Sequence, residues 1–326
     1  MKNFQLVRAA SPSSAVASIA KDESSKFIAG GTNLIDLMKK GVSAPDRLVD
    51  ITGLDLKQVM QLQGKIRIGA LAKNSQVSED ALIKSKHPLL SMALVAGASQ
   101  QIRHMATVGG NMLQRTRCSY FYNTDMPCNK REPKTGCGAM EGYNRMHAIF
   151  GASDKCIAVH PSDMCVALAA LNATVFVEGP KGSREIKFTD FHRLPGDTPE
   201  KDNILERNEL ITAIELPDNS FTKNVHYLKV RDRSSYAFAL VSVAVALDIK
   251  EGRINDARLA TGGVAHKPWR LTDAEKYLKG KAPSATIFKE AATLAMKGAK
   301  GHGDNNFKLQ LAPNAIAEAL TIAASK

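Results

Sequence analysis

The sequence predicts an α+β fold spread over more than one domain. Its 326 residues exceed what one ordinary hydrophobic core organises. The composition, 44% apolar and 23% charged, is that of a globular chain. Short strands and helices are mixed through the first two thirds of the chain, and strands followed by helices fill the last third.

The elements follow from the spacing of apolar residues. Alternating polarity predicts strands, and apolar residues three or four apart predict helices. In the first part we predict strands at 26–29, 47–51, 66–70, 173–178, 185–188 and 210–216, and helices at 33–40, 89–102 and 163–171. The turn-forming residues 217–220 predict a domain boundary. Beyond it we predict strands at 225–231, 239–249 and 259–264, then helices at 271–279, 285–299 and 313–325.

Residues 112–156 differ from their surroundings. They are rich in Arg, Cys, Pro, Gly, Tyr and Asn, and they show no sustained period. A segment of this kind has too small an apolar core of its own, so a metal centre is expected to hold it. We therefore predict an ordered insertion here.

Two diglycine turns predict a site for phosphate groups. One is Ile28-Ala29-Gly30-Gly31-Thr32-Asn33-Leu34, and the other is Thr107-Val108-Gly109-Gly110-Asn111. Glycine has no Cβ, so a phosphate can approach the backbone N–H groups closely, and a helix dipole favours its charge. Each turn alone also fits a plain strand–turn–helix connection. The pair is more specific, because two such loops could hold one pyrophosphate from both sides.

All five cysteines lie between residues 118 and 165. The spacings C-x9-C, C-x8-C and C-x18-C contain none of the close pairs that are typical of structural zinc sites. The first three cysteines also lie in polar sequence, whereas buried structural cysteines lie among apolar residues. A [4Fe–4S] cluster is therefore favoured over zinc, disulfides or four unrelated thiols. The proposed ligands are Cys118, Cys128, Cys137 and Cys156, and Cys165 on an apolar helix is expected in the core.

Two charged positions have both a structural and a functional interpretation. Asp163 stands at the start of a predicted helix, where it can cap the helix or accept a hydrogen bond from a cofactor. Lys229 lies on a strand of alternating charge, where it can face solvent or an electron-rich cofactor ring.

The net charge of +12 first suggests a nucleic-acid partner. No recognition motif accompanies it, so we expect no nucleic-acid binding and a basic surface that meets acidic partner subunits. The chain has no run of 18 apolar residues, so no membrane span is expected. The N-terminal segment lacks the apolar core of a secretory signal, which predicts a cytoplasmic location. Export of the folded chain on a signal-bearing partner subunit would place it in the periplasm instead.

Five motifs, in this order and spacing, resemble those of the FAD-binding medium subunits of the xanthine dehydrogenase family of molybdenum hydroxylases. They are the two glycine turns, Pro161-Ser162-Asp163, Ile214-Glu215-Leu216-Pro217 and Tyr227-Leu228-Lys229-Val230-Arg231. With its four-cysteine insertion, the chain further resembles the FAD and iron–sulfur subunit of bacterial periplasmic aldehyde oxidoreductases. The beta subunit of 4-hydroxybenzoyl-CoA reductase carries a comparable insertion.

The resemblance implies a division of the chain. Residues 1–218 would form a two-subdomain FAD-binding domain of the vanillyl-alcohol-oxidase type, with subdomains at about 1–55 and 56–218 and the iron–sulfur insertion at 112–156. Residues 219–326 would form a smaller C-terminal α+β domain.

The resemblance also implies roles for individual residues. Thr107, Gly110 and Asn111 would close over one side of the FAD pyrophosphate. Asp163 would approach the ribityl or flavin region, Ile211 would pack near the isoalloxazine, and Lys229 would reach the ring system. The residues implied to wrap the other side of the pyrophosphate are Lys26, Phe27, Ile28, Ala29, Gly30, Gly31, Thr32, Asn33 and Leu34.

The function implied is that of an electron-transfer subunit in a heterotrimer. An aldehyde would be oxidised at a molybdopterin-binding large subunit, and electrons would pass through [2Fe–2S] clusters of a small subunit to FAD here and then to an external acceptor. No residue of this chain is expected to act as a catalytic acid or base. The rival interpretations are the beta subunit of a 4-hydroxybenzoyl-CoA reductase-like enzyme and a zinc-stapled, non-catalytic binding protein.

Overall fold

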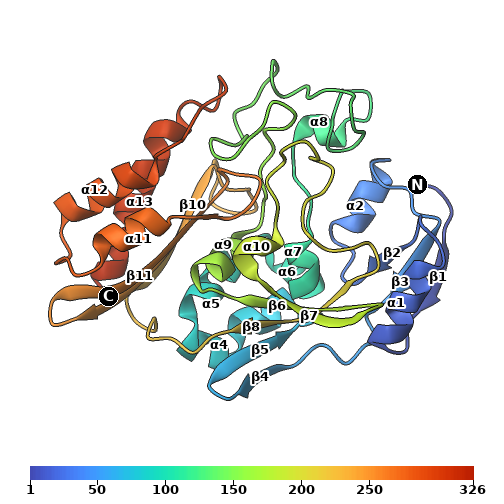
Figure 1. Ribbon diagram of the computed structural model, residues 1–326, viewed down its shortest axis with the longest axis horizontal. Coiled ribbons are helices and arrows are strands. Elements are labelled where there is room, and N and C mark those ends of the chain that lie inside the picture. The colour runs from blue at the N-terminus through green and yellow to red at the C-terminus, as the bar shows by residue number, and fades with distance from the viewer.

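The computed structural model describes residues 1–326 and contains three β-sheets (Figure 1). The N-terminal sheet is parallel, with strand order β1-β3-β2. Its strands are β1 (Gln5–Arg8), β2 (Lys26–Ile28) and β3 (Arg47–Asp50), and its helices are α1 (Pro12–Ala20) and α2 (Leu34–Lys39). The buried face of α1 packs on β3 through Val16, Ile19 and Val49, which gives this part a small core of its own.

The second sheet is antiparallel and has the order β4-β5-β8-β6-β7. Its strands are β4 (Val59–Leu62), β5 (Lys65–Gly69), β6 (Thr174–Gly179), β7 (Gly182–Lys187) and β8 (Leu210–Leu216). The helices of this part are α3 (Asn74–Glu79), α4 (Ala81–Lys86), α5 (Pro88–Ala96), α6 (Gln100–Met105), α7 (Val108–Met112), α9 (Asp163–Ala170) and α10 (Phe188–Phe191). Every residue of α9 is buried, because this helix lies in a core shared by the second and third sheets.

The third sheet is also antiparallel, with the order β12-β11-β10-β9. Its strands are β9 (Val225–Val230), β10 (Val241–Lys250), β11 (Arg253–Gly262) and β12 (Trp269–Arg270). Three helices, α11 (Thr272–Leu278), α12 (Ala285–Ala295) and α13 (Lys308–Ala324), cover one face of it (Figure 1). They bury a second apolar core against that face.

The predicted elements are present with shifted ends, and three of them need correction. The predicted helix 89–102 is two helices, α5 and α6, because the chain leaves the helical conformation at Gly97 and Ala98 has a φ of 51°. The predicted strand 259–264 is the end of the ten-residue β11. The predicted helix 313–325 begins earlier, at Lys308, so that Pro313 lies inside α13 rather than at its start. The sequence patterns also missed the strands β1, β4 and β12 and the helices α1, α3, α4, α7 and α10.

The insertion has little regular structure, as predicted. Its helix α8 (Ser119–Tyr122) is short, and its small apolar cluster is formed by Phe121 and Cys128 with Leu37 of α2. Polar contacts shape the loop instead. The Arg131 guanidinium donates hydrogen bonds to the carbonyl oxygens of Tyr120, Phe121, Asn123, Thr124 and Met126.

The insertion lies against two other parts of the molecule. In Figure 1 it lies across the top of the molecule, between the N-terminal part and the C-terminal helices.

The second sheet ends with β8 and the third begins with β9, on either side of residue 218. The domain limits 1–218 and 219–326 themselves stay a prediction. No helix combines the length and the apolar character that a bilayer crossing needs.

Asn305 ties the C-terminal part to the insertion, which gives a test of the fold. Its fully buried Nδ2 donates to the carbonyl oxygens of His147 and Ala148 at 3.2 and 2.9 Å, and its Oδ1 accepts from the His302 N–H at 2.6 Å. We predict that Asn305→Ala lowers the free energy of unfolding by about 2–4 kcal/mol, because buried carbonyl groups lose their donors. Chemical denaturation measures this free energy of unfolding.

The matched control is Asn314→Ala, at an exposed position of α13. This change should alter the free energy of unfolding by no more than about 0.5 kcal/mol. Equal effects of the two substitutions would contradict the role given to Asn305.

Candidate functional site

A cavity of about 660 Å³ opens between the N-terminal sheet and the second sheet. Both glycine turns contribute to its wall, although they are more than 70 residues apart in the sequence. The predicted residues that line it are Lys26, Phe27, Ile28, Ala29, Gly30, Gly31, Thr32, Asn33, Leu34, Thr107, Gly110 and Ile211. The structure therefore brings most of the predicted cofactor-binding residues to one cavity.

Glycine is required in the first turn for two separate reasons. A Cβ at Gly30 would lie 2.1 Å from the carbonyl oxygen of Met105, so only glycine permits this approach of the two loops. Gly31 has a φ of +71°, a conformation that other residues rarely adopt. The turn is thus packed against the segment that leads into the second turn.

The second turn is held by its own side chain and by the neighbouring backbone. Thr107 Oγ1 accepts a hydrogen bond from the Gly110 N–H at 3.2 Å, which caps α7. The Gly109 N–H donates to the carbonyl oxygen of Ala70 at 2.8 Å. At the other end of α7, the Nε2 atoms of His160 and His192 lie 3.3 and 2.9 Å from the carbonyl oxygen of Met112. Burial lowers the pKa of His192 to about 4, so this imidazole is neutral at pH 7.

The chemistry of the cavity fits an anionic dinucleotide. Desolvation lowers the pKa of the Lys26 ammonium, and the positive charges of Arg115 and Arg207, which line the same cavity, lower it further. Three cations therefore line the cavity, together with the carboxylates of Glu23, Glu206 and Glu209. Asn33 Nδ2 and Ser25 Oγ are buried in its wall without a hydrogen-bond partner in the chain, which leaves both available to a ligand.

Three predicted residues lie outside the lining of this cavity. The Asn111 side chain accepts a hydrogen bond from Ser162 Oγ at 2.7 Å. Asp163 and Lys229 form a buried ion pair at 2.8 Å, and the Tyr227 hydroxyl donates to the other Asp163 oxygen at 2.8 Å. The alternative role of Asp163 as a helix cap is wrong, because Ser162 caps α9 through the Cys165 N–H.

Four cysteines of the insertion line one narrow pocket: Cys118, Cys128, Cys137 and Cys156. Cys128 and Cys137 face each other across an antiparallel bridge, and His147 Nε2 lies 3.1 Å from the Cys118 sulfur. Burial raises the pKa of Cys118 to about 12 and that of Cys156 to about 11, so as free thiols both stay protonated at neutral pH. A bound metal would instead favour their thiolate forms.

The distances between ligand atoms distinguish a site for a single metal ion from a site for an iron–sulfur cluster. Around tetrahedral zinc, with Zn–S bonds of about 2.3 Å, neighbouring sulfurs lie about 3.8 Å apart. Ligand atoms that all lie within 4.8 Å of one another are found at His160, Cys165 and His192, and the four insertion cysteines form no such group. The insertion cysteines are therefore not gathered as closely as the ligands of one ion, and the pocket that they line encloses about 10 Å³. Cys165 lies apart from the pocket, fully buried in the apolar core, as predicted.

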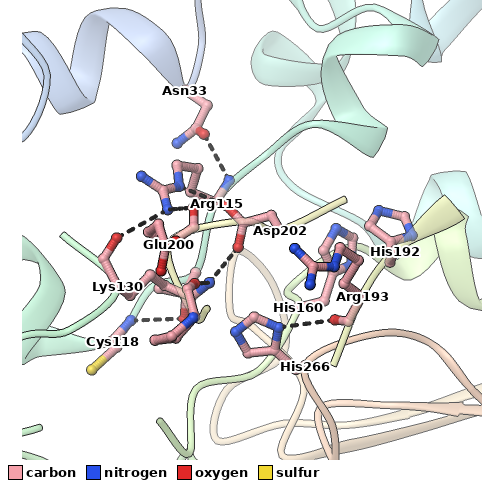
Figure 2. A network of polar contacts seen from close by, with 12 residues as sticks. Asn33, Arg115, Cys118, Lys130, His160, His192, Arg193, Glu200, Asp202 and His266 are labelled. Atoms are coloured by element: carbon pink, nitrogen blue, oxygen red, sulfur yellow. Dashed lines mark hydrogen bonds and ion pairs between the residues drawn. The ribbon is translucent and has the colours of Figure 1, made fainter. Parts of the chain in front are cut away.

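An ion network joins Arg115 of the cavity wall to Lys130 of the thiol pocket through Asp202 (Figure 2). One oxygen of Asp202 accepts from Arg115 Nε at 2.7 Å, and the other oxygen pairs with the ammonium of Lys130. Burial alone would raise the pKa of Asp202, but the charges of Lys130 and Arg115 hold it well below its usual value. The Arg115 N–H also donates to Asn33 Oδ1 at 2.9 Å, which attaches the network to the first glycine turn.

The sequence did not reveal Arg115, Arg207 or the Asp202 network. Arg207 donates to the carbonyl oxygens of Ile19 and Asp22, and Asp202 binds residues 87 and 72 positions away. Contacts over such separations leave no local pattern. Between residues 103 and 147 the sequence has seven Lys or Arg residues and three Asp or Glu residues, and this local excess was the only signal of this charge.

The fold and the cavity define a flavin-dinucleotide-binding subunit, to which a loop with four cysteines is added. The family described as the FAD binding domain in molybdopterin dehydrogenase matches residues 2–219, and the CO dehydrogenase flavoprotein C-terminal domain matches residues 226–323. The chain belongs to the FAD-binding medium subunits of the molybdenum hydroxylase family.

Individual relatives agree with this family. The chain is 45% identical over 324 residues to the aldehyde oxidoreductase FAD-binding subunit PaoB of Escherichia coli K12, and the match covers 98% of each chain. It is 31% identical to the glyceraldehyde dehydrogenase medium chain of Sulfolobus acidocaldarius, over 89% of this chain and 86% of that one. Its fold is similar to that of a chain of carbon monoxide dehydrogenase from Hydrogenophaga pseudoflava, with a TM-score of 0.78 and 23% identity over 99% and 98% of the two chains.

The close approach at Gly30 gives a test of the cavity. Gly30→Ala places a methyl group against the Met105 carbonyl, so both glycine turns must move apart. We predict that FAD affinity falls by at least about tenfold, measured by flavin retention and titration of the purified protein. Gly53→Ala is the control, because a Cβ there meets no atom within 4 Å. Normal FAD binding by Gly30→Ala would contradict the assignment of this cavity.

Proposed function

We propose that this chain is the FAD and [4Fe–4S] electron-transfer subunit of a heterotrimeric, molybdenum-dependent aldehyde oxidoreductase. The observation that carries the proposal is the pairing of a dinucleotide-sized cavity with a four-thiol pocket in one chain. The similarity to an aldehyde oxidoreductase subunit and to a glyceraldehyde dehydrogenase subunit favours an aldehyde as the substrate of the complex.

The cavity residues would bind and orient the dinucleotide. FAD, when bound, supplies the redox chemistry of the subunit. The backbone of Lys26–Leu34 and the turn from Thr107 to Asn111 would hold its pyrophosphate, with Asn33 Nδ2 as a free donor. Lys26, Arg115 and Arg207 would balance its negative charge.

Three residues are assigned to the flavin end. Ile211 would pack against the ring, since it is an apolar residue in the cavity wall. Asp163 would approach the ribityl or flavin region, and Lys229 would lie close to the ring system. The ion pair between Asp163 and Lys229 holds both side chains in place. Two further hydrogen bonds support it, from Lys229 to the Ala96 carbonyl at 3.0 Å and from the Tyr227 hydroxyl to Asp163.

The thiol pocket would hold the [4Fe–4S] cluster through Cys118, Cys128, Cys137 and Cys156. An anionic cluster of this kind is stabilised by nearby cations and N–H donors. Lys130 and Lys155 line the pocket, and His147 contacts Cys118. The four cysteines do not form a compact group of ligands for one ion, which favours this cluster over the zinc-stapled alternative.

The assembly would contain a molybdopterin-binding large subunit and a [2Fe–2S] small subunit. Electrons released when the large subunit oxidises an aldehyde with water would reach this chain through the small subunit, and an external acceptor would remove them. The aldehyde-related relatives favour this direction over that of a 4-hydroxybenzoyl-CoA reductase-like enzyme. The cytoplasmic location, with export on a partner as the alternative, stays a prediction.

Serine substitutions test the cluster. We predict that the protein, isolated without oxygen, contains about four irons and four sulfides per chain. Cys128→Ser should lose at least half of this iron, because it removes one ligand from a pocket with little apolar core.

Cys165→Ser is the matched control, since Cys165 is also buried but lies outside the pocket. It should keep its iron, as measured by metal and sulfide analysis. Zinc in place of iron, or equal iron loss in both variants, would contradict the proposed cluster.

A further inference from the structure

Asp202 stands between the two cofactor sites and contacts a cation of each. Arg115 lines the dinucleotide cavity, and Lys130 lines the thiol pocket. The Asp202 carboxylate binds both at once, one through each oxygen (Figure 2). The three charges sum to +1, so this one carboxylate decides whether the region between the sites carries one or two uncompensated positive charges.

The network is held in place on every side. Lys130 is almost completely buried, with 2% of its side chain exposed, and its ammonium also donates to the Pro199 carbonyl at 2.8 Å. Arg115 donates to the carbonyl oxygens of Glu200 and Lys130, and its guanidinium stacks on the ring of Phe121 at 4.7 Å. Phe121 in turn lines the thiol pocket. Neither cation can move away from Asp202 without losing these contacts.

Both ends of the network act on groups inside the sites. On one side the charge of Arg115 contributes to lowering the pKa of Lys26 in the dinucleotide cavity. On the other side, the buried Lys130 and the Phe121 ring on which Arg115 stacks both line the thiol pocket. The charge that Asp202 balances is therefore felt in both pockets.

We propose that Asp202 is a positioning residue that sets the charge presented to both cofactors, so that the cluster potential and the FAD affinity change together when its charge is lost. This inference rests on the proposed function. The cluster gains one negative charge on reduction, so an additional uncompensated cation beside it stabilises the reduced form. The same cation strengthens the attraction for the anionic pyrophosphate.

Asp202→Asn tests the proposal, because it removes the charge with little change of shape. In the holoprotein, the ratio of reduced to oxidised cluster at a fixed potential should rise by about tenfold, a positive shift of about 59 mV for one electron. The FAD dissociation constant should fall by about threefold or more. An EPR-monitored redox titration and a flavin titration measure the two effects.

Two variants serve as controls. Asp202→Glu keeps the charge and should keep both properties near those of the unaltered protein. Glu215→Gln removes a carboxylate that likewise bridges two cations, Lys65 at 2.9 Å and Arg67 at 2.7 Å, but that lines neither site. It should leave the potential and the FAD affinity unchanged, although it also breaks two ion pairs.

The outcomes separate this inference from the proposed function. An unaltered protein without an iron–sulfur cluster would contradict the proposed function itself. An intact cluster whose potential is unchanged in Asp202→Asn, or a change at only one of the two sites, would overturn the inference alone. If Asp202→Asn does not assemble its cluster, Lys130→Gln is the alternative test, because it removes a positive charge from the same network where Asp202→Asn removes a negative one. Its potential should fall, and an unchanged value would overturn the inference.

Discussion

The arrangement of both pockets depends on the two ion pairs of the Asp202 carboxylate. It binds Arg115 and Lys130 from the insertion, and through the Arg115 N–H the contact continues to Asn33 in the first glycine turn. Burying one member of such a network without the others is strongly unfavourable, because an unpaired charge would remain in a poorly solvated place. Asp202 therefore holds the first glycine turn and the insertion in one fixed relation.

This constraint matters because the insertion cannot fix itself. Its apolar cluster is small, and its loops depend on Arg131, Asn305 and the Asp202 network for their positions. Four sulfurs that converge on one pocket would add metal–thiolate bonds to these contacts, and such binding energy contributes directly to folding. The dinucleotide cavity, in contrast, lies between two sheets with their own cores, so its shape does not depend on a metal centre.

The sequence predicted those parts of the site whose chemistry is local. Gly30 and Gly31 were predicted because a glycine turn at a helix start lets a phosphate approach the backbone, and the structure adds a close approach to Met105 and a positive φ as further reasons for glycine. The cysteines were predicted as ligands because all five are clustered and three of them lie in polar sequence. Arg115, Asp202 and Lys130 were missed, since ion pairs between distant residues follow no period. The helix at 89–102 was predicted as one element because its apolar spacing continues across Gly97, where the backbone leaves the helix.

In the arrangement that we propose, one chain holds a dinucleotide and an iron–sulfur cluster on opposite sides of the Asp202 network. The most direct test is a crystal structure of the holoprotein with anomalous diffraction data on both sides of the iron absorption edge. The account predicts iron density enclosed by Cys118, Cys128, Cys137 and Cys156, and FAD density along the turn at Gly30 and Gly31. Zinc or an empty thiol pocket, or FAD bound elsewhere, would contradict it.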